Sequence, residues 1–271
     1  MIPSEFKTIF SQIEIPRQYR KAEWEKLLEY YYDDRWRPQK AVSDTRDESI
    51  IRNDLIKLSE SHPLAYVSGK AHFYGRVFEI APGVLVPRPE TEELVEWAIK
   101  ELTKGSEVLD MGCGSGCIAL TLAKERPDLK VSAMDASEAA LEITRKNIER
   151  FDLSIKIEKD NILSPSDELL GKRWQCIISN PPYVRPSEAS DTIQQEPDMA
   201  LFTPEDDPLL FYRALCEYAE HCLQPSGMIY LELSEYFAQE IFEIFSKSEW
   251  RDCIIRKDLQ RKPRMLRAIK R

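Results

Sequence analysis

Residues 108–116 read Val-Leu-Asp-Met-Gly-Cys-Gly-Ser-Gly and decide the fold of this chain. They join an apolar strand, expected at 107–110, to an apolar helix, expected at 117–125. Glycines at alternate positions let the backbone turn tightly and let a ligand approach it closely. Because Cys117 and not glycine follows, the spacing differs from the Gly-x-Gly-x-x-Gly fingerprint of dinucleotide sites. The loop therefore favours a ligand other than a pyrophosphate.

Strand-like and helix-like segments alternate on both sides of this loop. Helices are expected at 90–104, 117–125, 137–151, 208–223 and 235–247. Strands are expected at 107–110, 130–135, 154–159, 174–179 and 227–233, with a closing hairpin at 251–256 and 264–270. Strands that alternate with helices predict an α/β fold, in which a mostly parallel, doubly wound sheet is covered on both faces.

The first 87 residues have a different character. Residues 1–70 show helical spacing of apolar side chains, with Ser43 or Asp44 as the cap of a third helix, and predict a small helical bundle. Residues 71–87 predict a β-hairpin linker, with strands at 73–80 and 84–86 around the Pro82-Gly83 turn. We therefore expect three parts, namely the bundle at 1–70, the linker at 71–87 and a catalytic domain at 88–271.

The composition argues against several classes of protein. The chain has 271 residues and a formal net charge of −9, whereas a protein that grips duplex nucleic acid usually presents a basic face. Apolar runs fall short of a membrane span, and the first residues do not form a secretory signal. The six cysteines lack the spacing of a disulfide framework or a metal site. We expect a cytoplasmic monomer without a metal.

Acidic residues follow two of the predicted strands. Asp135 ends the strand after the glycine loop, where a carboxylate can accept from both hydroxyls of a ribose. Asp160 and Asn161 follow the next strand and could reach the edge of an adenine, because strand ends of an open α/β sheet converge on one crevice. Such residues also cap helices and form turns, and for Asp160 alone we favour that role.

Asn180-Pro181-Pro182-Tyr183 follows the strand expected at 174–179. Two prolines fix two φ angles and remove two backbone donors, so the segment is a stiff, non-helical stub. It carries one amide side chain, free carbonyls and one aromatic ring, which suit a planar group that both donates and accepts hydrogen bonds. The irregular stretch at 181–206 comes next, and loops of this length are usually functional or disordered.

Taken together, these motifs resemble the protein-(glutamine-N5) methyltransferases that modify peptide chain release factors. The resemblance extends from about His62 to the last residue. It is carried by Pro-Leu-Ala-Tyr-Val-Ser-Gly at 63–69, Phe-Tyr-Gly at 73–75, Val-Pro-Arg-Pro-Glu-Thr-Glu at 86–92, the glycine loop at 110–116, Asn-Pro-Pro-Tyr at 180–183 and Glu-Pro at 196–197. Two positions depart from the family pattern: Asn161 stands where relatives often carry a large apolar residue, and Arg261 stands where they often carry glycine.

The resemblance implies the seven-stranded sheet of S-adenosylmethionine-dependent methyltransferases. It also implies S-adenosylmethionine as cofactor, S-adenosylhomocysteine as product and the glutamine of a Gly-Gly-Gln tripeptide as target. The expected catalytic residues are Asn180, Pro181 and Tyr183, and the expected substrate contacts are Asn180, Pro181, Pro182 and Tyr183. The expected cofactor contacts are Gly112, Cys113, Gly114, Ser115, Gly116, Asp135, Asn161 and Asn180. Arg88, Glu90 and Glu92 are either helix N-terminal charges or lie near the entrance of the site.

Three other functions stay open at this point. An adenine-N6 methyltransferase could use the same Asn-Pro-Pro-Tyr grip, although it would have to unstack a base and hold a polyanion. A ribosomal protein glutamine could be the target instead of a release factor. A non-catalytic adaptor could keep the fold. The acidic chain and the Pro-Arg-Pro-Glu-Thr-Glu segment favour a glutamine over a base as the target. By the resemblance we expect a release factor as protein partner, with the N-terminal bundle and hairpin as its docking surface, and no direct contact to nucleic acid or membrane.

Overall fold

The computed structural model describes residues 48–60, 62–189, 195–247 and 249–271. The chain divides into two compact units, of which one contains residues 1–70 with 191–195 and the other contains residues 71–190 with 196–271. In the first unit, α3 (Glu48–Ser59) agrees with the third helix expected from the sequence, and α4 (Leu64–Ser68) follows it. The other expected helices of the bundle lie outside the described residues, so the bundle stays a prediction.

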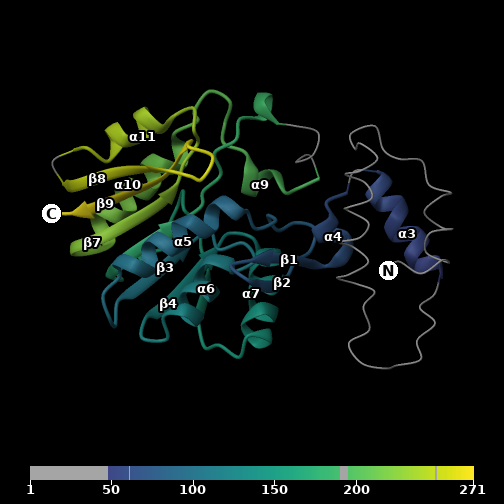
Figure 1. The fold of residues 1–271 in the computed structure, drawn as a ribbon. Helices are drawn as coiled ribbons and strands as arrows, with labels where there is room; N and C mark the ends of the chain where they lie inside the picture. Colours follow the sequence, from purple (N-terminus) through teal and green to yellow (C-terminus); the bar gives the residue numbers. More distant parts are fainter. Residues whose placement is uncertain (1–47, 61, 190–194, 248) are drawn as a thin grey trace. The chain divides into compact units, whose positions relative to one another are not determined.

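A seven-stranded sheet forms the centre of the second unit (Figure 1). Its strand order is β5-β4-β3-β6-β7-β9-β8. The strands are β3 (Glu107–Met111), β4 (Lys130–Asp135), β5 (Lys156–Lys159), β6 (Trp174–Ser179), β7 (Leu223–Glu232), β8 (Trp250–Lys257) and β9 (Pro263–Lys270). Five strands run parallel, and β9 lies antiparallel between β7 and β8. The predicted α/β class and the paired closing hairpin are confirmed.

Helices cover both faces of this sheet, as the alternation of segments predicted. On one face, α5 (Pro89–Glu101), α6 (Cys117–Glu125) and α7 (Glu138–Arg150) enclose an apolar core that includes Trp97 and Tyr230. On the other face, α8 (Asp167–Leu170), α10 (Leu210–Cys222) and α11 (Ala238–Ile244) enclose a second core that includes Tyr212 and Phe245. The sheet is therefore doubly wound.

The predicted hairpin exists, but its turn was placed wrongly. The two strands are β1 (Lys70–Phe73) and β2 (Arg76–Glu79), and they are joined at Tyr74-Gly75 and not at Pro82-Gly83. Tyr74 and Gly75 both have positive φ, at 49° and 70°, and two left-handed residues match the twist of a tight hairpin. The Pro82-Gly83 segment makes a separate turn, closed by a bond from Val84 N to the Ala81 carbonyl. Residues 84–86 are not a strand.

The long stretch after β6 also contains regular structure. The short 3₁₀ helix η1 (Pro186–Glu188) and the helix α9 (Asp198–Leu201) lie within it. A bridge between Val184 and Phe202 closes the ends of the segment on each other. The segment thus returns to the point where it left β6, which places its second half beside the carboxyl edge of the sheet.

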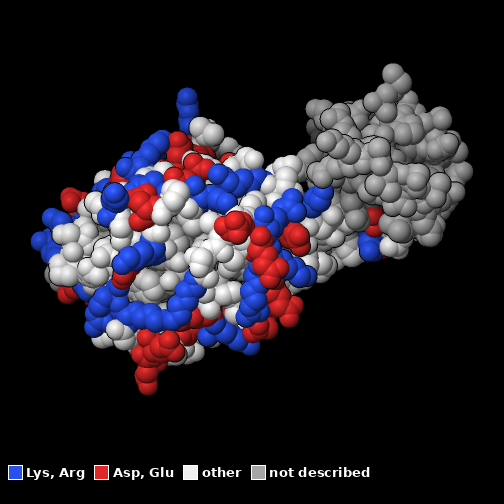
Figure 2. All heavy atoms as spheres, turned by 90° about the horizontal axis from the view of Figure 1, so that it is seen from below, with Lys and Arg blue, Asp and Glu red and all other residues white. Residues whose placement is uncertain are grey.

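The surface of the described residues carries both signs of charge. On the face that Figure 2 shows, Lys and Arg side chains are interspersed with Asp and Glu side chains.

At the β8–β9 turn, Arg261 has φ of 66°, so this non-glycine residue adopts the left-handed conformation in which glycine is common. Among the described residues, no helix has the length and apolar character needed to cross a membrane.

Candidate active site

A cavity of about 220 Å³ opens at the carboxyl ends of β3, β4 and β6. In an open α/β sheet, this edge is where ligands bind. Several of the predicted site residues line the cavity: Gly112, Cys113, Gly114, Ser115, Asp135, Asn161, Asn180 and Pro182. Gly116, Pro181 and Tyr183 are not part of its lining. The structure thus brings the predicted cofactor loop and the first residue of Asn-Pro-Pro-Tyr to one cavity.

The three loop glycines have different roles. Gly112 and Gly114 both have positive φ, and a Cβ at either position would meet no atom closer than 3.5 Å. A Cβ would thus make only ordinary van der Waals contacts at both positions, and the positive φ is what favours glycine there. Gly116 also has positive φ, but a Cβ there would lie 2.6 Å from Leu120 Cδ1. The packing of α6 therefore requires glycine at position 116, and the expected cofactor contact of Gly116 stays a prediction.

Asp135 organises the glycine loop from the end of β4. Its Oδ2 accepts from Gly114 N at 2.8 Å, and its Oδ1 accepts from Ser137 N at 2.8 Å. Burial raises the pKa of this carboxyl group, while the backbone donors at Ser137 and Gly114 act in the opposite direction. Each carboxylate oxygen has a further lone pair, so Asp135 can hold the loop and still accept from a ligand hydroxyl.

The two residues after β5 have separate tasks. Asp160 accepts from Ser166 Oγ at 2.6 Å and from the backbone N–H groups of Ser166 and Asn161, which is the turn chemistry expected for it, while Ser166 itself caps α8. Asn161 lines the cavity, and its Oδ1 accepts from Leu163 N at 2.9 Å. Ile162 and Leu163 also line the cavity and supply the apolar surface that Asn161 does not. The side-chain NH₂ of Asn161 is then the group that can donate to a ligand.

Asn180 is held by a chain of hydrogen bonds that the sequence did not reveal. Its Nδ2 donates to Thr91 Oγ1 at 3.2 Å, and Thr91 Oγ1 donates to Glu232 Oε2 at 2.6 Å. Tyr183 donates its hydroxyl to Glu232 Oε1 at 3.0 Å. Glu232 ends β7 and is only 1% exposed, and its burial raises its pKa. Thr91 and Glu232 therefore connect the first and last residues of Asn-Pro-Pro-Tyr.

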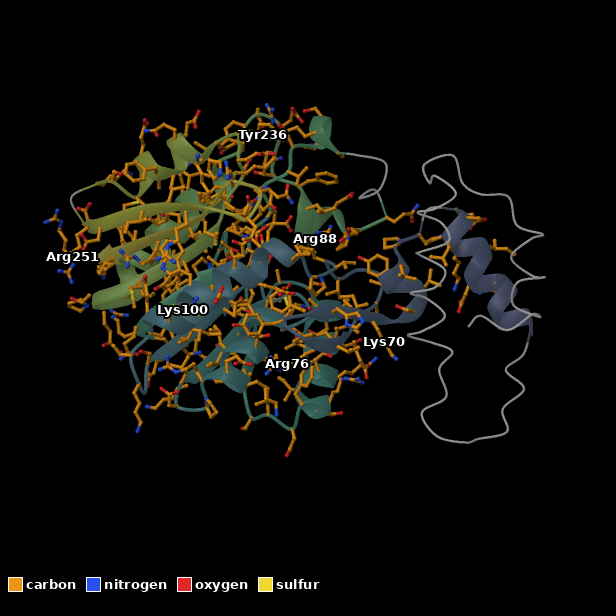
Figure 3. All side chains as sticks on the ribbon, viewed as in Figure 1. Lys70, Arg76, Arg88, Lys100, Tyr236 and Arg251 are labelled. Atoms are coloured by element: carbon orange, nitrogen blue, oxygen red, sulfur yellow. The ribbon has the colours of Figure 1, made fainter. Side chains whose placement is uncertain are left out.

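An ion pair joins the segment before α5 to the segment before α9. Arg88 Nη2 lies 2.5 Å from Glu196 Oε1, and Glu196 Oε2 accepts from Val86 N at 3.0 Å. Arg88, labelled in Figure 3, lines the cavity together with Pro197 and Met199. Of the other charges in this motif, Glu92 accepts from Tyr74 N, so it supports the β1–β2 turn. Arg88 thus belongs to the site, and Glu92 supports the hairpin beside it.

Two buried oxygen atoms near the loop have no protein partner among the described residues. They are Asp110 Oδ1 and Ser115 Oγ. Burial raises the pKa of Asp110 to about 8, and a bond from Ala119 N to Oδ2 acts against this rise. Buried polar atoms are usually bonded, and of these two residues only Ser115 lines the cavity, where a ligand could supply the missing partner.

The thiols of the site are not nucleophiles. Burial raises the pKa of Cys117 to about 12 and raises that of Cys113 well above its ordinary value, so both stay protonated. Within the described part of the chain, no group of three or more His, Cys, Asp or Glu side chains could hold a metal ion.

Comparison with known proteins shows the family of this chain. A model of the methyltransferase small domain matches residues 91–197. The release factor glutamine methyltransferase of Bacteroides thetaiotaomicron is 40% identical over 222 residues, which is 80% of each chain. That of Flavobacterium psychrophilum is 39% identical over 223 residues, covering 79% of this chain and 78% of the relative. The chain belongs to the release factor glutamine methyltransferase family. The resemblance found in the sequence is confirmed.

A solved structure supports the fold of this family member. A methyltransferase from Pyrococcus furiosus superimposes with a TM-score of 0.55 at 22% identity, covering 80% of this chain and 98% of that one. The predicted methyltransferase sheet is thereby confirmed. The roles of the individual site residues, the monomeric state, the cytoplasmic location and the domain boundaries stay predictions.

Proposed function

We propose that this chain transfers the methyl group of S-adenosylmethionine to the side-chain nitrogen of the glutamine in the Gly-Gly-Gln motif of peptide chain release factors. The observation that carries the proposal is the position of Asn180. It lines the cavity beside the glycine loop, and its Nδ2 is already bonded to Thr91. Its side-chain oxygen, which has no protein donor among the described residues, is the end that suits an N–H donor.

The residues of the cavity fit S-adenosylmethionine. Asp135 would accept from the ribose hydroxyls, and Asn161 would donate to the adenine edge between the apolar side chains of Ile162 and Leu163. Gly112 and Gly114 line the cavity, and without a Cβ they would let the ligand approach the backbone closely. Ser115 lines the cavity, and its buried Oγ would suit a polar group of the ligand's tail. Product S-adenosylhomocysteine would occupy the same contacts.

The protein's part in the reaction is to hold a weak nucleophile in line. When bound, S-adenosylmethionine supplies a methyl group on a positively charged sulfur, and its carbon–sulfur bond breaks as the glutamine nitrogen bonds the methyl carbon and gives up a proton. Asn180 Oδ1 and the Pro181 carbonyl would each accept one hydrogen of the target amide, which orients the nitrogen lone pair. Pro182 and Tyr183 would fix the shape of this grip. Cavity residues thus orient the substrate and need not remove a proton first.

Two other substrates use the same chemistry. A glutamine of a ribosomal protein would enter the cavity in the same way. An adenine in nucleic acid has a similar planar NH₂ group, but the net charge of −9 and the mixed charges in Figure 2 disfavour a polyanion. The curated names of the relatives favour the release factor.

The direct test is incubation of the protein with S-adenosylmethionine and a purified release factor. Mass spectrometry should find one added methyl on the glutamine of Gly-Gly-Gln and none on a factor in which that glutamine is replaced. Duplex DNA and a ribosomal protein fraction serve as competing substrates. Methyl transfer to either of these, with an unmodified release factor, would refute the proposal.

A further inference from the structure

We propose that Glu232, acting through Thr91, is a positioning residue that decides which end of the Asn180 side-chain amide faces the substrate. The inference rests on the proposed function only in taking the substrate to be an amide N–H donor. Glu232 comes from the end of β7, Thr91 from the first turn of α5 and Asn180 from the end of β6. They are therefore brought together by the fold and not by the local sequence.

The direction of each hydrogen bond follows from the number of hydrogens available. The Thr91 hydroxyl has one hydrogen, and it is donated to Glu232 Oε2 at 2.6 Å. The Thr91 oxygen then offers only lone pairs to its other neighbour. Asn180 must present its NH₂ to that oxygen, as it does at 3.2 Å. The opposite end of the amide, Oδ1, is thereby left as the acceptor in the cavity.

This series of hydrogen bonds requires Glu232 to be ionised, because both oxygens of a carboxylate accept hydrogen bonds and neither donates one. One oxygen accepts from Thr91, and the other accepts from Tyr183. If Glu232 donated to Thr91 instead, the threonine hydrogen would turn toward Asn180 and favour the flipped amide. A flipped amide would present NH₂ to the NH₂ of a glutamine, where two donors repel.

The environment of Glu232 balances opposing effects. Burial raises its pKa, while the hydrogen bonds from Thr91 and Tyr183 and the positive charge of Arg264 lower it. The negative charge of Glu90 acts in the same direction as burial. Arg264 is held by Asp258 at 3.1 Å, so a fixed cation on β9 supports the ionised form. Burying a carboxylate costs desolvation free energy, so the position of Glu232 is better explained by its hydrogen bonds to Thr91 and Tyr183 than by filling space.

The test compares three threonine variants of the full chain. Thr91→Val removes the hydroxyl at nearly constant volume, and Thr91→Ser restores it. Thr121→Val is the matched control, because Thr121 is equally buried and its Oγ1 has no hydrogen-bond partner in the described structure. We expect Thr91→Val to lower kcat by about 10- to 100-fold, the range for partners that orient a functional side chain. The kcat of Thr91→Ser should stay within a few-fold of the wild-type value, and the kcat of Thr121→Val should equal the wild-type value.

A second measurement needs neither substrate nor turnover. In protein labelled with ¹⁵N at asparagine, the Asn180 side-chain signal is identified by its loss in Asn180→Asp. Hydrogen exchange of this NH₂ should be slow in wild type, in Thr91→Ser and in Thr121→Val, and faster in Thr91→Val. The dissociation constant of S-adenosylmethionine should change less than kcat does in Thr91→Val, since Asp135 and the glycine loop are untouched by the substitution.

The outcomes separate this inference from the proposed function. If wild type modifies no release factor but the exchange pattern holds, the proposed function fails and the positioning role stands. If Thr91→Val keeps wild-type kcat, or if Thr91→Ser is as slow as Thr91→Val, the positioning role is wrong. Should Thr91→Val fail to fold, Glu232→Gln replaces it, because a glutamine cannot accept at both ends. That variant should show faster Asn180 exchange and a similar loss of kcat, and wild-type values in both would overturn the inference.

Discussion

The guanidinium of Arg88 and the carboxylate of Glu196 form an ion pair at 2.5 Å across 108 residues of sequence. The pair joins the segment that leads into α5 to the segment that leads into α9. Pro197 and Met199, which follow Glu196, line the cavity. The ion pair therefore fixes part of the cavity wall, and its loss should weaken the affinity of the cavity for its ligand.

Arg88→Met should lower the free energy of unfolding by about 1–2 kcal/mol and weaken cofactor affinity. The Glu196 side chain is 3% exposed and would keep Val86 N as its main partner, whereas Arg88 is 31% exposed. The loss is therefore smaller than the ~3–5 kcal/mol for breaking a fully buried pair. Urea unfolding and calorimetric titration with S-adenosylmethionine measure the two effects. Lys100→Met, which breaks a solvent-exposed pair with Glu96, is the control and should change neither by more than about 0.5 kcal/mol.

Asn180→Ala should lower kcat by about 10²–10³-fold, the loss seen when one preorganised polar group is removed from a reacting centre. The proposed role is to accept a hydrogen from the target amide, so the loss should appear in single-turnover methyl transfer. Cofactor affinity should change less than turnover does. Unchanged single-turnover rates would show that Asn180 does not hold the reacting amide.

Asp135→Ala should weaken cofactor binding by about 1.5–3 kcal/mol, the range for hydrogen bonds to a charged group. Part of this loss comes from the glycine loop, because Gly114 N would lose its acceptor. Asp135→Asn keeps one acceptor oxygen and should lie between Ala and wild type. Calorimetric titration with S-adenosylmethionine measures the affinity of each variant. A wild-type affinity for Asp135→Ala would exclude the ribose role.

Stability of the cofactor-free protein should fall as the pH rises from about 4 to about 8, in part because of Asp110. The pKa of this carboxyl is raised from 3.8 to about 8 in the folded chain, so in this range the folded state holds a proton that the unfolded state has lost. Asp110→Asn should flatten the slope, with a difference on the order of a few kcal/mol across the range. The raised pKa of Asp135 acts in the same direction, so some slope should remain. Urea unfolding at a series of pH values provides the measurement, and equal slopes for variant and wild type would contradict the assignment.

Much of the fold could be predicted because local patterns agree with it. The helix at 117–125 and the strands at 130–135 and 174–179 have the predicted bounds, since glycine, proline and polar residues limit each apolar run. The β1–β2 turn could not be located, because Tyr74 takes a left-handed conformation that tyrosine rarely signals. Pro82-Gly83 carries the stronger turn signal in the sequence, but it forms a separate turn outside the hairpin.

The candidate site was predictable only where a residue type carries its own chemistry. The glycine loop, Asp135 and Asn180 were found in this way. Thr91 resembles an ordinary residue in the first turn of a helix, and its bond to Glu232 spans 141 residues. One signal was present, since Glu232 is a charged residue inside the apolar run 228–233. A charge in a buried strand requires a partner, but the sequence does not say which one.

The position of β9 bears on how the protein is made. β9 fills the place between β7 and β8, and its Met265 pairs with Glu232. While the chain is being synthesised, β7 remains an open edge with free backbone groups until residues 263–270 have emerged. The carboxylate that directs Asn180 would meanwhile sit on an uncovered strand. A nascent chain can thus form the glycine loop early, but the strand that carries Glu232 is paired on both sides only after residues 263–270 have emerged.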